Sequence, residues 1–281
     1  MEWLTEHKIP LGSWIRDGVD FMLDHGAWLF DSFSDGLAFL VNGLVDVMLW
    51  VPALGLIVVF AAAAYALHRS WKLAALIVFS LLLVINLGYW EETVRTIGLI
   101  LVATFVCMIV GIPLGILAAH RARFYMVLRP ILDLMQTIPT FVYLIPTMIM
   151  FGLGVVPGLI STVIFAIPAP IRLTYLGISG VPQTLIEAGE AFGATRRQIL
   201  WKIELPHAMP TIMAGVTQCI MLCLSMVVIA AMVGAPGLGV PVLRALNTVN
   251  IAKGFEAGLA IVIIAILLDR VCKQPDGKEQ K

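Results

Sequence analysis

The sequence predicts an all-α polytopic membrane protein. Of its 281 residues, 60% are hydrophobic and only 13% are charged, a balance far from that of a soluble domain. The apolar residues also gather into runs, and a helix needs about 20 such residues to cross the core of a bilayer. About seven transmembrane helices are expected, at residues 46–67, 73–89, 97–118, 132–151, 157–178, 210–233 and 255–270.

Residues 1–43 precede these runs and predict an amphipathic helix that lies in the membrane interface instead of crossing it. Acidic residues recur there at helical spacing, namely Asp17, Asp20, Asp24, Asp31 and Asp35. Aromatic residues fall largely on the other sides of the helix, namely Trp14, Phe21, Trp28 and Phe33. We expect the acidic side to face water at the outer surface. A short soluble helix is the alternative.

The distribution of Lys and Arg predicts the orientation, because cytoplasmic segments carry the excess of these residues. With residues 184–206 placed inside, twelve basic residues lie in inner segments and five in outer segments. The prediction is therefore an outer N-terminus and a cytoplasmic tail at residues 271–281. Because the formal net charge is zero, the charge balance indicates no nucleic-acid partner.

Prolines interrupt consecutive spans, namely Pro113, Pro139, Pro146, Pro168 and Pro170. A proline removes a backbone hydrogen bond and kinks a helix. Such kinks are either ordinary bends or signs of helices that line a passage of changing shape. Polar residues near them are candidates for lining a translocation path, namely Gln136, Thr137, Thr140, Tyr143, Thr147 and Thr174.

Residues 184–206 form the longest polar interruption in the apolar C-terminal half. Apolar residues recur in this segment at roughly helical spacing. Gly193 lies between two short helical patterns, and Pro206 follows the second. The segment therefore predicts a helix-turn-helix at the membrane surface. It is either a solvated hairpin or a surface for a partner.

The same segment resembles the EAA loop of the permease subunits of bacterial ABC importers. The family pattern is E-A-A, three residues, G, nine residues, then I-x-L-P, and this chain departs from it at Gly189, where a second alanine is usual. The resemblance implies a docking site for the ATPase subunit. Its residues are Glu187, Ala188, Gly189, Gly193, Ile203, Leu205 and Pro206. We expect Glu187 in the first helical turn, where free N–H groups favour a carboxylate.

Catalytic motifs are missing from the sequence. It contains no G-x-x-x-x-G-K-[ST], H-E-x-x-H or G-x-S-x-G, so no catalytic residue, cofactor site or metal site is expected. ATP and Mg²⁺ would be bound by the partner ATPase. The cysteines are interpreted as small buried apolar residues. Asp133 is expected to pair with Arg129 four residues earlier, and Arg172 to extend toward the cytoplasm.

From residue 90 to residue 270 the chain also resembles the glycine betaine, proline and choline permeases. This resemblance implies a five-helix type I importer core, preceded by two additional spans in residues 44–89. It further implies a bacterial inner-membrane location and alternating access driven by an ATPase pair. A second identical permease and a periplasmic or lipid-anchored binding protein complete the implied assembly. A permease for another small polar solute such as an amino acid, a stand-alone secondary transporter and a membrane scaffold are the alternatives.

Overall fold

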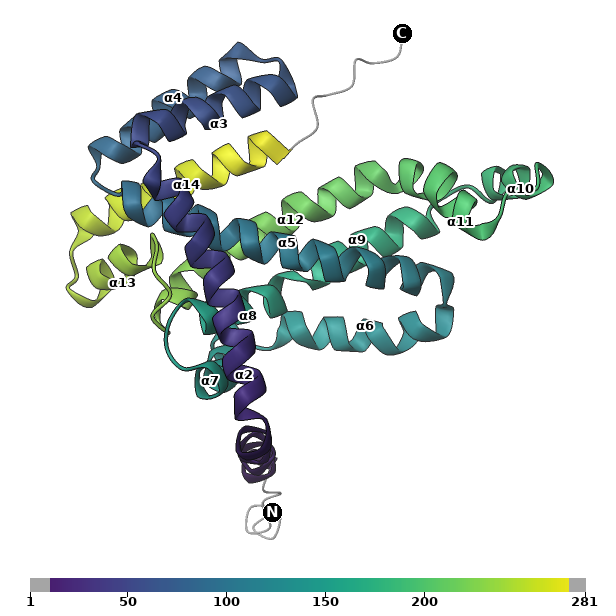
Figure 1. Ribbon diagram of the computed structural model, residues 1–281, viewed down its shortest axis with the longest axis horizontal. Coiled ribbons are helices and arrows are strands. Elements are labelled where there is room, and N and C mark those ends of the chain that lie inside the picture. Colours follow the sequence, from purple (N-terminus) through teal and green to yellow (C-terminus); the bar gives the residue numbers. More distant parts are fainter. Residues whose placement is uncertain (1–10, 273–281) are drawn as a thin grey trace, which may run out of the picture.

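The computed structural model describes residues 11–272, which form helices joined by short turns and contain no strand. The predicted all-α class is confirmed. Figure 1 shows several of the long helices side by side. The first elements are α2 (Leu11–Trp50), α3 (Ala53–His68), α4 (Trp71–Asn86), α5 (Trp90–His120), α6 (Ala122–Thr137) and α7 (Thr140–Phe151). The later ones are α8 (Val155–Ala166), α9 (Pro168–Ser179), α10 (Gln183–Ala191), α11 (Arg196–Ile199), the π-helical η1 (Leu200–Glu204), α12 (Leu205–Ala231), α13 (Gly239–Asn247) and α14 (Ile251–Cys272).

Five helices of the described chain are long and apolar enough to cross a membrane, or six if the bent pair α6–α7 counts as one span. The five are Phe30–Trp50, Trp90–His120, Val155–Ser179, Arg196–Ala231 and Ile251–Cys272. This count differs from the seven expected spans, because α3 and α4 have only 16 residues each. A helix of that length is about 24 Å long and falls short of a bilayer core of about 30 Å.

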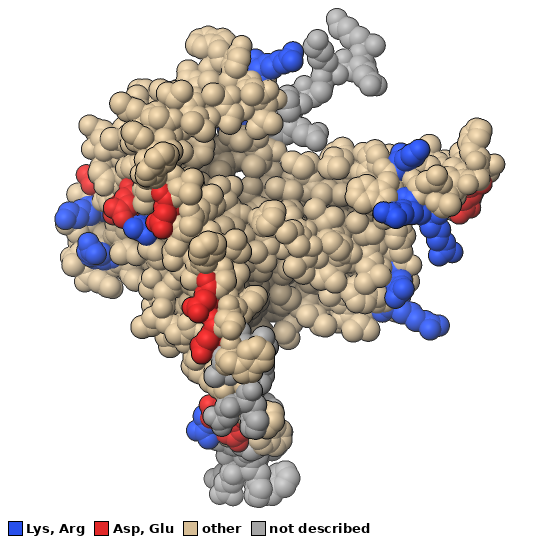
Figure 2. Space-filling model, in the orientation of Figure 1, with Lys and Arg blue, Asp and Glu red and all other residues tan. Residues whose placement is uncertain are grey.

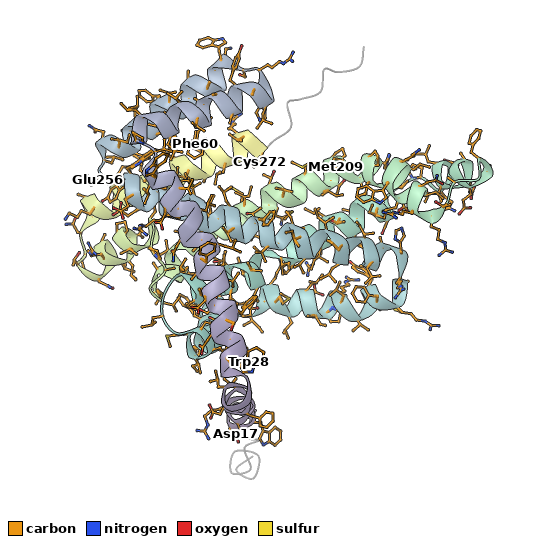
Figure 3. The ribbon with its side chains drawn as sticks, viewed as in Figure 1. Asp17, Trp28, Phe60, Met209, Glu256 and Cys272 are labelled. Atoms are coloured by element: carbon orange, nitrogen blue, oxygen red, sulfur yellow. The ribbon has the colours of Figure 1, made fainter. Side chains whose placement is uncertain are left out.

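The expected span 46–67 is not one helix, because the chain breaks between Trp50 and Ala53. Pro52 occupies the break, and a proline disfavours helical geometry at the residue before it. The apolar residues up to Trp50 therefore continue α2, so the expected interfacial helix and the candidate span Phe30–Trp50 are parts of one element. Asp17 and Trp28 project from its N-terminal part (Figure 3). Figure 1 shows α2 crossing α5 instead of running alongside it.

The expected span 132–151 is also divided, with a bend of 96° between α6 and α7. Ile138 and Pro139 form the break, and both have extended ψ angles near 130°. The hydroxyl of Tyr143 donates a hydrogen bond to the carbonyl of Met135 across this bend. The side chain thus satisfies a carbonyl that the broken helix leaves free.

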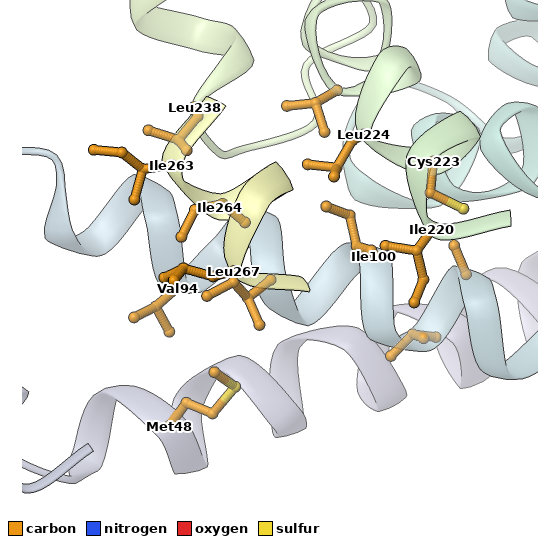
Figure 4. Packing of buried hydrophobic residues seen from close by; sticks show 14 of the residues in the cluster. Met48, Val94, Ile100, Ile220, Cys223, Leu224, Leu238, Ile263, Ile264 and Leu267 are labelled. Atoms are coloured by element: carbon orange, nitrogen blue, oxygen red, sulfur yellow. The ribbon is translucent and has the colours of Figure 1, made fainter. Parts of the chain in front are cut away.

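The helices α5, α9 and α12 form the centre of the molecule and contact one another along their lengths. Small residues allow these close crossings. A Cβ atom on Gly115 of α5 would lie 2.6 Å from Cβ of Thr174 and 2.7 Å from the carbonyl oxygen of Ile171, both on α9. Figure 4 shows the apolar core nearby, with side chains from α5, α12 and α14 directed toward one another.

Candidate functional site

Three short helices at one end of the bundle, α10, α11 and η1, form a projection that we call the polar hairpin (residues 183–204). It extends beyond the other helices and leads directly into α12 (Figure 1). Figure 2 shows Lys and Arg side chains gathered at this end of the molecule. The helix-turn-helix predicted for residues 184–206 is therefore confirmed.

The turn of the polar hairpin depends on Gly193, which has a φ angle of +75°. The amide groups of Gly193 and Ala194 donate hydrogen bonds to the carbonyls of Glu190 and Gly189, which closes the end of α10. No described atom lies within 4 Å of the position that a Cβ would take on Gly193. Glycine is therefore required here by the backbone conformation and not by a lack of space.

A capping box begins α11 immediately after this turn. The hydroxyl of Thr195 accepts a hydrogen bond from the amide of Gln198, and the amide of Thr195 donates to the Gln198 side chain over 2.8 Å. Two amides that would lack helical partners are thereby satisfied. The sequence analysis did not identify this device, although its T-x-x-Q spacing was available as a signal.

The two halves of the polar hairpin pack together through Gly189 and Ile203. A Cβ atom on Gly189 would lie 2.6 Å from Cδ1 of Ile203, and Ile199 lies on the same side. Gly189 and Ile199 are buried. The side chain of Ile203 therefore occupies the space that the Cβ atom of an alanine at position 189 would need. The departure from the family pattern at Gly189 thus has a packing reason.

The seven predicted docking residues divide into two groups. Leu205 packs on the buried cluster of Ile178, Ala208 and Ile212, and together with Gly189 and Ile203 it supports the hairpin. By contrast, Glu187, Ala188, Gly193 and Pro206 are exposed. The expected place of Glu187 in the first turn of the helix is wrong. Because α10 begins at Gln183, this carboxylate lies beyond the first turn, where the free N–H groups are located.

The exposed surface of the polar hairpin is mixed in character. Phe192 is 93% exposed and Trp201 is 63% exposed, with Leu185 also exposed. Charged residues accompany them, namely Glu187, Glu190, Arg196, Arg197 and Lys202. Aromatic residues surrounded by charged groups are typical of protein–protein interfaces. The surface is therefore suited to a partner protein.

A contact that the sequence analysis missed joins the base of the polar hairpin to α5. The Nε2 atom of His120 lies 2.9 and 3.1 Å from the two carboxylate oxygens of Glu204. Glu204 is only 6% exposed, and a buried carboxylate needs such a partner. The two residues are 84 positions apart, so no local spacing could have indicated the pair.

The six candidate path residues include hydroxyl groups with different surroundings. The buried hydroxyl of Thr147 lies 2.9 Å from that of Ser161 and joins α7 to α8. Thr174 is buried against α5, and its hydroxyl has no hydrogen-bond partner in the described chain. Thr137 donates to the carbonyl of Leu134 on its own helix. A role in translocation stays a prediction for all six, namely Gln136, Thr137, Thr140, Tyr143, Thr147 and Thr174.

The expected pair of Asp133 with Arg129 is not formed. Instead, Nη2 of Arg172 on α9 lies 2.6 Å from Oδ1 of Asp133 on α6. Tyr125 and Tyr175 stack between the same two helices, with ring centroids 3.6 Å apart. An ion pair and a ring stack therefore hold α6 against α9, and the packing of these helices has replaced the local pair.

The opposite end of the bundle contains a polar cavity of about 410 Å³. Its charged lining residues are Glu92, Arg244 and Lys253, from α5, α13 and α14. Tyr89 also lines it, and burial, followed by the carboxylates of Glu256 and Glu92, raises the pKa of Tyr89. This end can therefore present polar groups of both signs. The described residues contain no group of His, Cys, Asp and Glu side chains that could hold a metal ion.

The described chain is therefore a helical bundle with several helices long and apolar enough to cross a membrane, and with a hairpin that projects from one end. Residues 111–271 match the family "Binding-protein-dependent transport system inner membrane component", and the chain belongs to this family. It is 48% identical to the glycine betaine transport system permease protein OpuAB of Bacillus subtilis, over 97% of this chain and 96% of that protein.

A second relative agrees with this assignment, and a solved structure shares the fold. The chain is 45% identical to the glycine betaine/proline betaine transport system permease protein ProW of Escherichia coli, over 98% of this chain and 78% of that protein. One inward-facing structure of the MetNI methionine ABC transporter shares the fold, with a TM-score of 0.57 and 24% identity, over 62% of this chain and 87% of the solved chain.

Proposed function

We propose that the chain is the membrane permease subunit of an ATP-driven importer for glycine betaine or a related quaternary amine such as proline betaine or choline. The observation that carries this proposal is the near full-length similarity to glycine betaine permeases, at 43–48% identity for the first three of these relatives. The chain would form the translocation path, while a separate protein would bind ATP and Mg²⁺. The absence of a P-loop motif from the sequence supports this division of labour.

The polar hairpin would dock on the ATPase. Its exposed aromatic and charged residues support this role, and its continuity with α12 provides a direct connection into the membrane bundle. Movement at the hairpin base would also reach α5 through the contact of Glu204 with His120. Because each chain has one such hairpin, a pair of ATPase subunits would need a second copy of the permease.

The substrate would arrive on a separate periplasmic or lipid-anchored binding protein at the end of the bundle opposite the polar hairpin. The mixed charges around the polar cavity there support such a contact. In this arrangement the N-terminus lies outside and the C-terminus in the cytoplasm of a bacterial inner membrane, as the distribution of Lys and Arg favours.

Uptake of radiolabelled glycine betaine, in a strain that lacks the chain and again after its return, tests the proposal. Uptake should require the chain, its ATPase and its binding protein. Competition by unlabelled choline, proline betaine and methionine then ranks the substrates. Uptake by the purified chain in liposomes without an ATPase would instead show a secondary transporter, and preferential competition by methionine would show an amino-acid permease.

A further inference from the structure

An apolar cavity of about 180 Å³ lies between the α3–α4 pair and the central bundle. We call the pair the apolar hairpin (residues 53–86). The cavity is lined only by apolar side chains, from α3, α4, α5 and α14, namely Phe60, Ile77, Leu81, Ile97, Leu101, Ile264, Leu267, Leu268 and Val271. Figure 3 labels Phe60 on α3, beside the part of α14 that ends at Cys272. An apolar cavity of similar size, about 150 Å³, excludes water and takes up apolar ligands.

Basic residues lie close to Val271, which lines one part of this cavity. The Nε2 atom of His68 donates to the carbonyl of Val271 over 2.8 Å, which brings the end of α3 to the end of α14. Arg69 and Arg270 adjoin these two residues in the sequence, and both are exposed. Lys72, in the first turn of α4, is exposed as well. Asp269 is half-buried and takes part in an interaction of its own, so the fully exposed charges named here, all within the described residues, are positive.

The arrangement has the two parts of a phospholipid site. Apolar walls suit an acyl chain, and exposed basic residues at one end suit an anionic headgroup at the membrane surface. Trp71, which is 70% exposed beside Lys72, is a residue type enriched at that level of the bilayer. The cavity provides room for the chain, because it lies between the apolar hairpin and the two helices that α4 contacts, α5 and α14.

We propose that one acyl chain of an anionic phospholipid occupies this cavity, with its headgroup bound by Arg69, Lys72 and Arg270. The lipid comes from the leaflet on the side of the polar hairpin and ties the apolar hairpin to α14. The site is separate from the docking surface and from the polar cavity at the opposite end. Its occupation does not require transport, so it can be tested whether or not the proposed substrate is right.

The test uses the full chain in nanodiscs that contain a phosphatidylglycerol with a diazirine at mid-chain. After illumination, the cross-linked peptides are identified by mass spectrometry and compared with those from the matching phosphatidylcholine. We expect cross-links concentrated on the segments that line the cavity, and several-fold more of them from phosphatidylglycerol. Equal labelling by both lipids, spread along the exposed sides of α2 and α7, would indicate ordinary boundary lipid and overturn the proposal.

Two sets of variants separate the headgroup from the acyl chain. Changing Arg69, Lys72 and Arg270 together to Gln should remove the preference for phosphatidylglycerol. The matched control changes Arg121, Arg123 and Arg129 to Gln, which removes three exposed basic residues at the same end of the bundle and should leave the preference intact. An equal loss of preference in both triple variants would reduce the effect to general surface charge and contradict a defined site.

The acyl-chain part is tested by filling the cavity from its wall. Leu268→Trp places a larger side chain in the cavity, whereas Ile266→Trp on the exposed side of α14 does not. Cross-linking at the cavity should fall several-fold in the first variant and stay unchanged in the second. If the first variant fails to reach the membrane, the triple Gln variant still decides the proposal. Unchanged cross-linking in a well-folded Leu268→Trp protein would overturn it.

Discussion

The polar hairpin and the apolar hairpin are built from the same local devices but serve different surroundings. Each has a left-handed residue at its turn, Gly193 in the first and Arg69 with a φ angle of 49° in the second. Each has a hydroxyl cap soon afterwards, from Thr195 or Ser70. The difference lies in the surface that each leaves exposed. The polar hairpin mixes charged and aromatic groups, whereas the apolar hairpin carries its charged residues only at its turn and in the first turn of α4.

Each hairpin is also held to another helix by one histidine, and here the chemistry differs. His120 contacts the buried carboxylate of Glu204, while His68 contacts only a backbone carbonyl of α14. Loss of a partner is far more costly for a buried carboxylate than for a carbonyl near the surface. The comparison teaches that hairpins with similar turns can be attached by contacts of unequal strength. We expect the contact of the polar hairpin to contribute more to stability than that of the apolar hairpin.

The largest expected effect concerns the side of the membrane on which both turns lie. Reporter fusions after Lys72 and Lys202 should both report the cytoplasm, and a fusion after Arg123 should agree with them. Fusions after Glu92 and Asn247 should report the outside, because the excess of Lys and Arg favours this orientation. Opposite locations for Lys72 and Lys202 would contradict the predicted orientation, since the turns of the two hairpins would then face different compartments.

Replacing the glycine of the polar turn should affect function next most strongly. Gly193→Val forces a β-branched residue to a φ angle of +75°. Strain of roughly 1–2 kcal/mol lowers the population of the hairpin conformation needed for docking about 5- to 30-fold. We expect near-normal permease in the membrane, with lost uptake and either lost ATPase retention or ATP hydrolysis no longer stimulated by loaded binding protein. Gly193→Asn is the control, because asparagine tolerates this conformation.

Two results would contradict this account of the turn. Normal uptake by Gly193→Val would show that the shape of the turn is not needed for coupling. Loss of the permease itself from the membrane, with Gly193→Asn unaffected, would show that the glycine serves folding and not docking.

Removing the histidine at the base of the polar hairpin should destabilise the protein measurably. His120→Ala leaves the buried carboxylate of Glu204 without its partner, which costs roughly 1–3 kcal/mol. The midpoint of thermal unfolding in detergent should fall, and His120→Asn should restore part of the loss by donating a hydrogen bond. If His120→Ala and the wild type have the same midpoint of thermal unfolding, the contact between His120 and Glu204 does not stabilise the protein.

The corresponding change in the apolar hairpin should have a smaller effect. His68→Ala removes one hydrogen bond to the carbonyl of Val271, which contributes about 1 kcal/mol. The same unfolding measurement compares the two variants directly. A larger loss from His68→Ala than from His120→Ala would reverse the ranking of the two connections.

The smallest expected effect has the opposite sign. Arg69→Asn places a residue that tolerates left-handed geometry where arginine is strained. We expect a stabilisation of at most about 1 kcal/mol, measured by unfolding in lipid-free detergent so that headgroup binding does not contribute. A clear destabilisation would show that the arginine side chain contributes more to the turn than its backbone strain costs.

Local patterns in the sequence predicted much of this molecule correctly. The apolar runs predicted the helical membrane class, and the spacing around Gly193 predicted the turn of the polar hairpin. Such features are readable because residues close in the sequence determine them, through helix periodicity and the conformational freedom of glycine.

Some helix boundaries were predicted wrongly, because two local signals in the sequence favoured different structures. Pro52 and Pro139 each divided an expected span, although both prolines were visible in the sequence. Hydrophobic run length favoured one helix, but the restriction that proline places on the preceding residue prevailed. Glu187 was placed in the first turn because the start of α10 at Gln183 was not recognised.

The sequence by itself determined the membrane class, the polar hairpin and its glycine turn, because short-range spacing encodes them. Only the tertiary structure decided that Asp133 pairs with Arg172, 39 residues away, and that Glu204 is buried against His120, 84 residues away. It also decided that Ile203 fills the space beside Gly189. These contacts depend on how whole helices cross, and the crossing is set by the packing of many side chains, which no single spacing in the chain records.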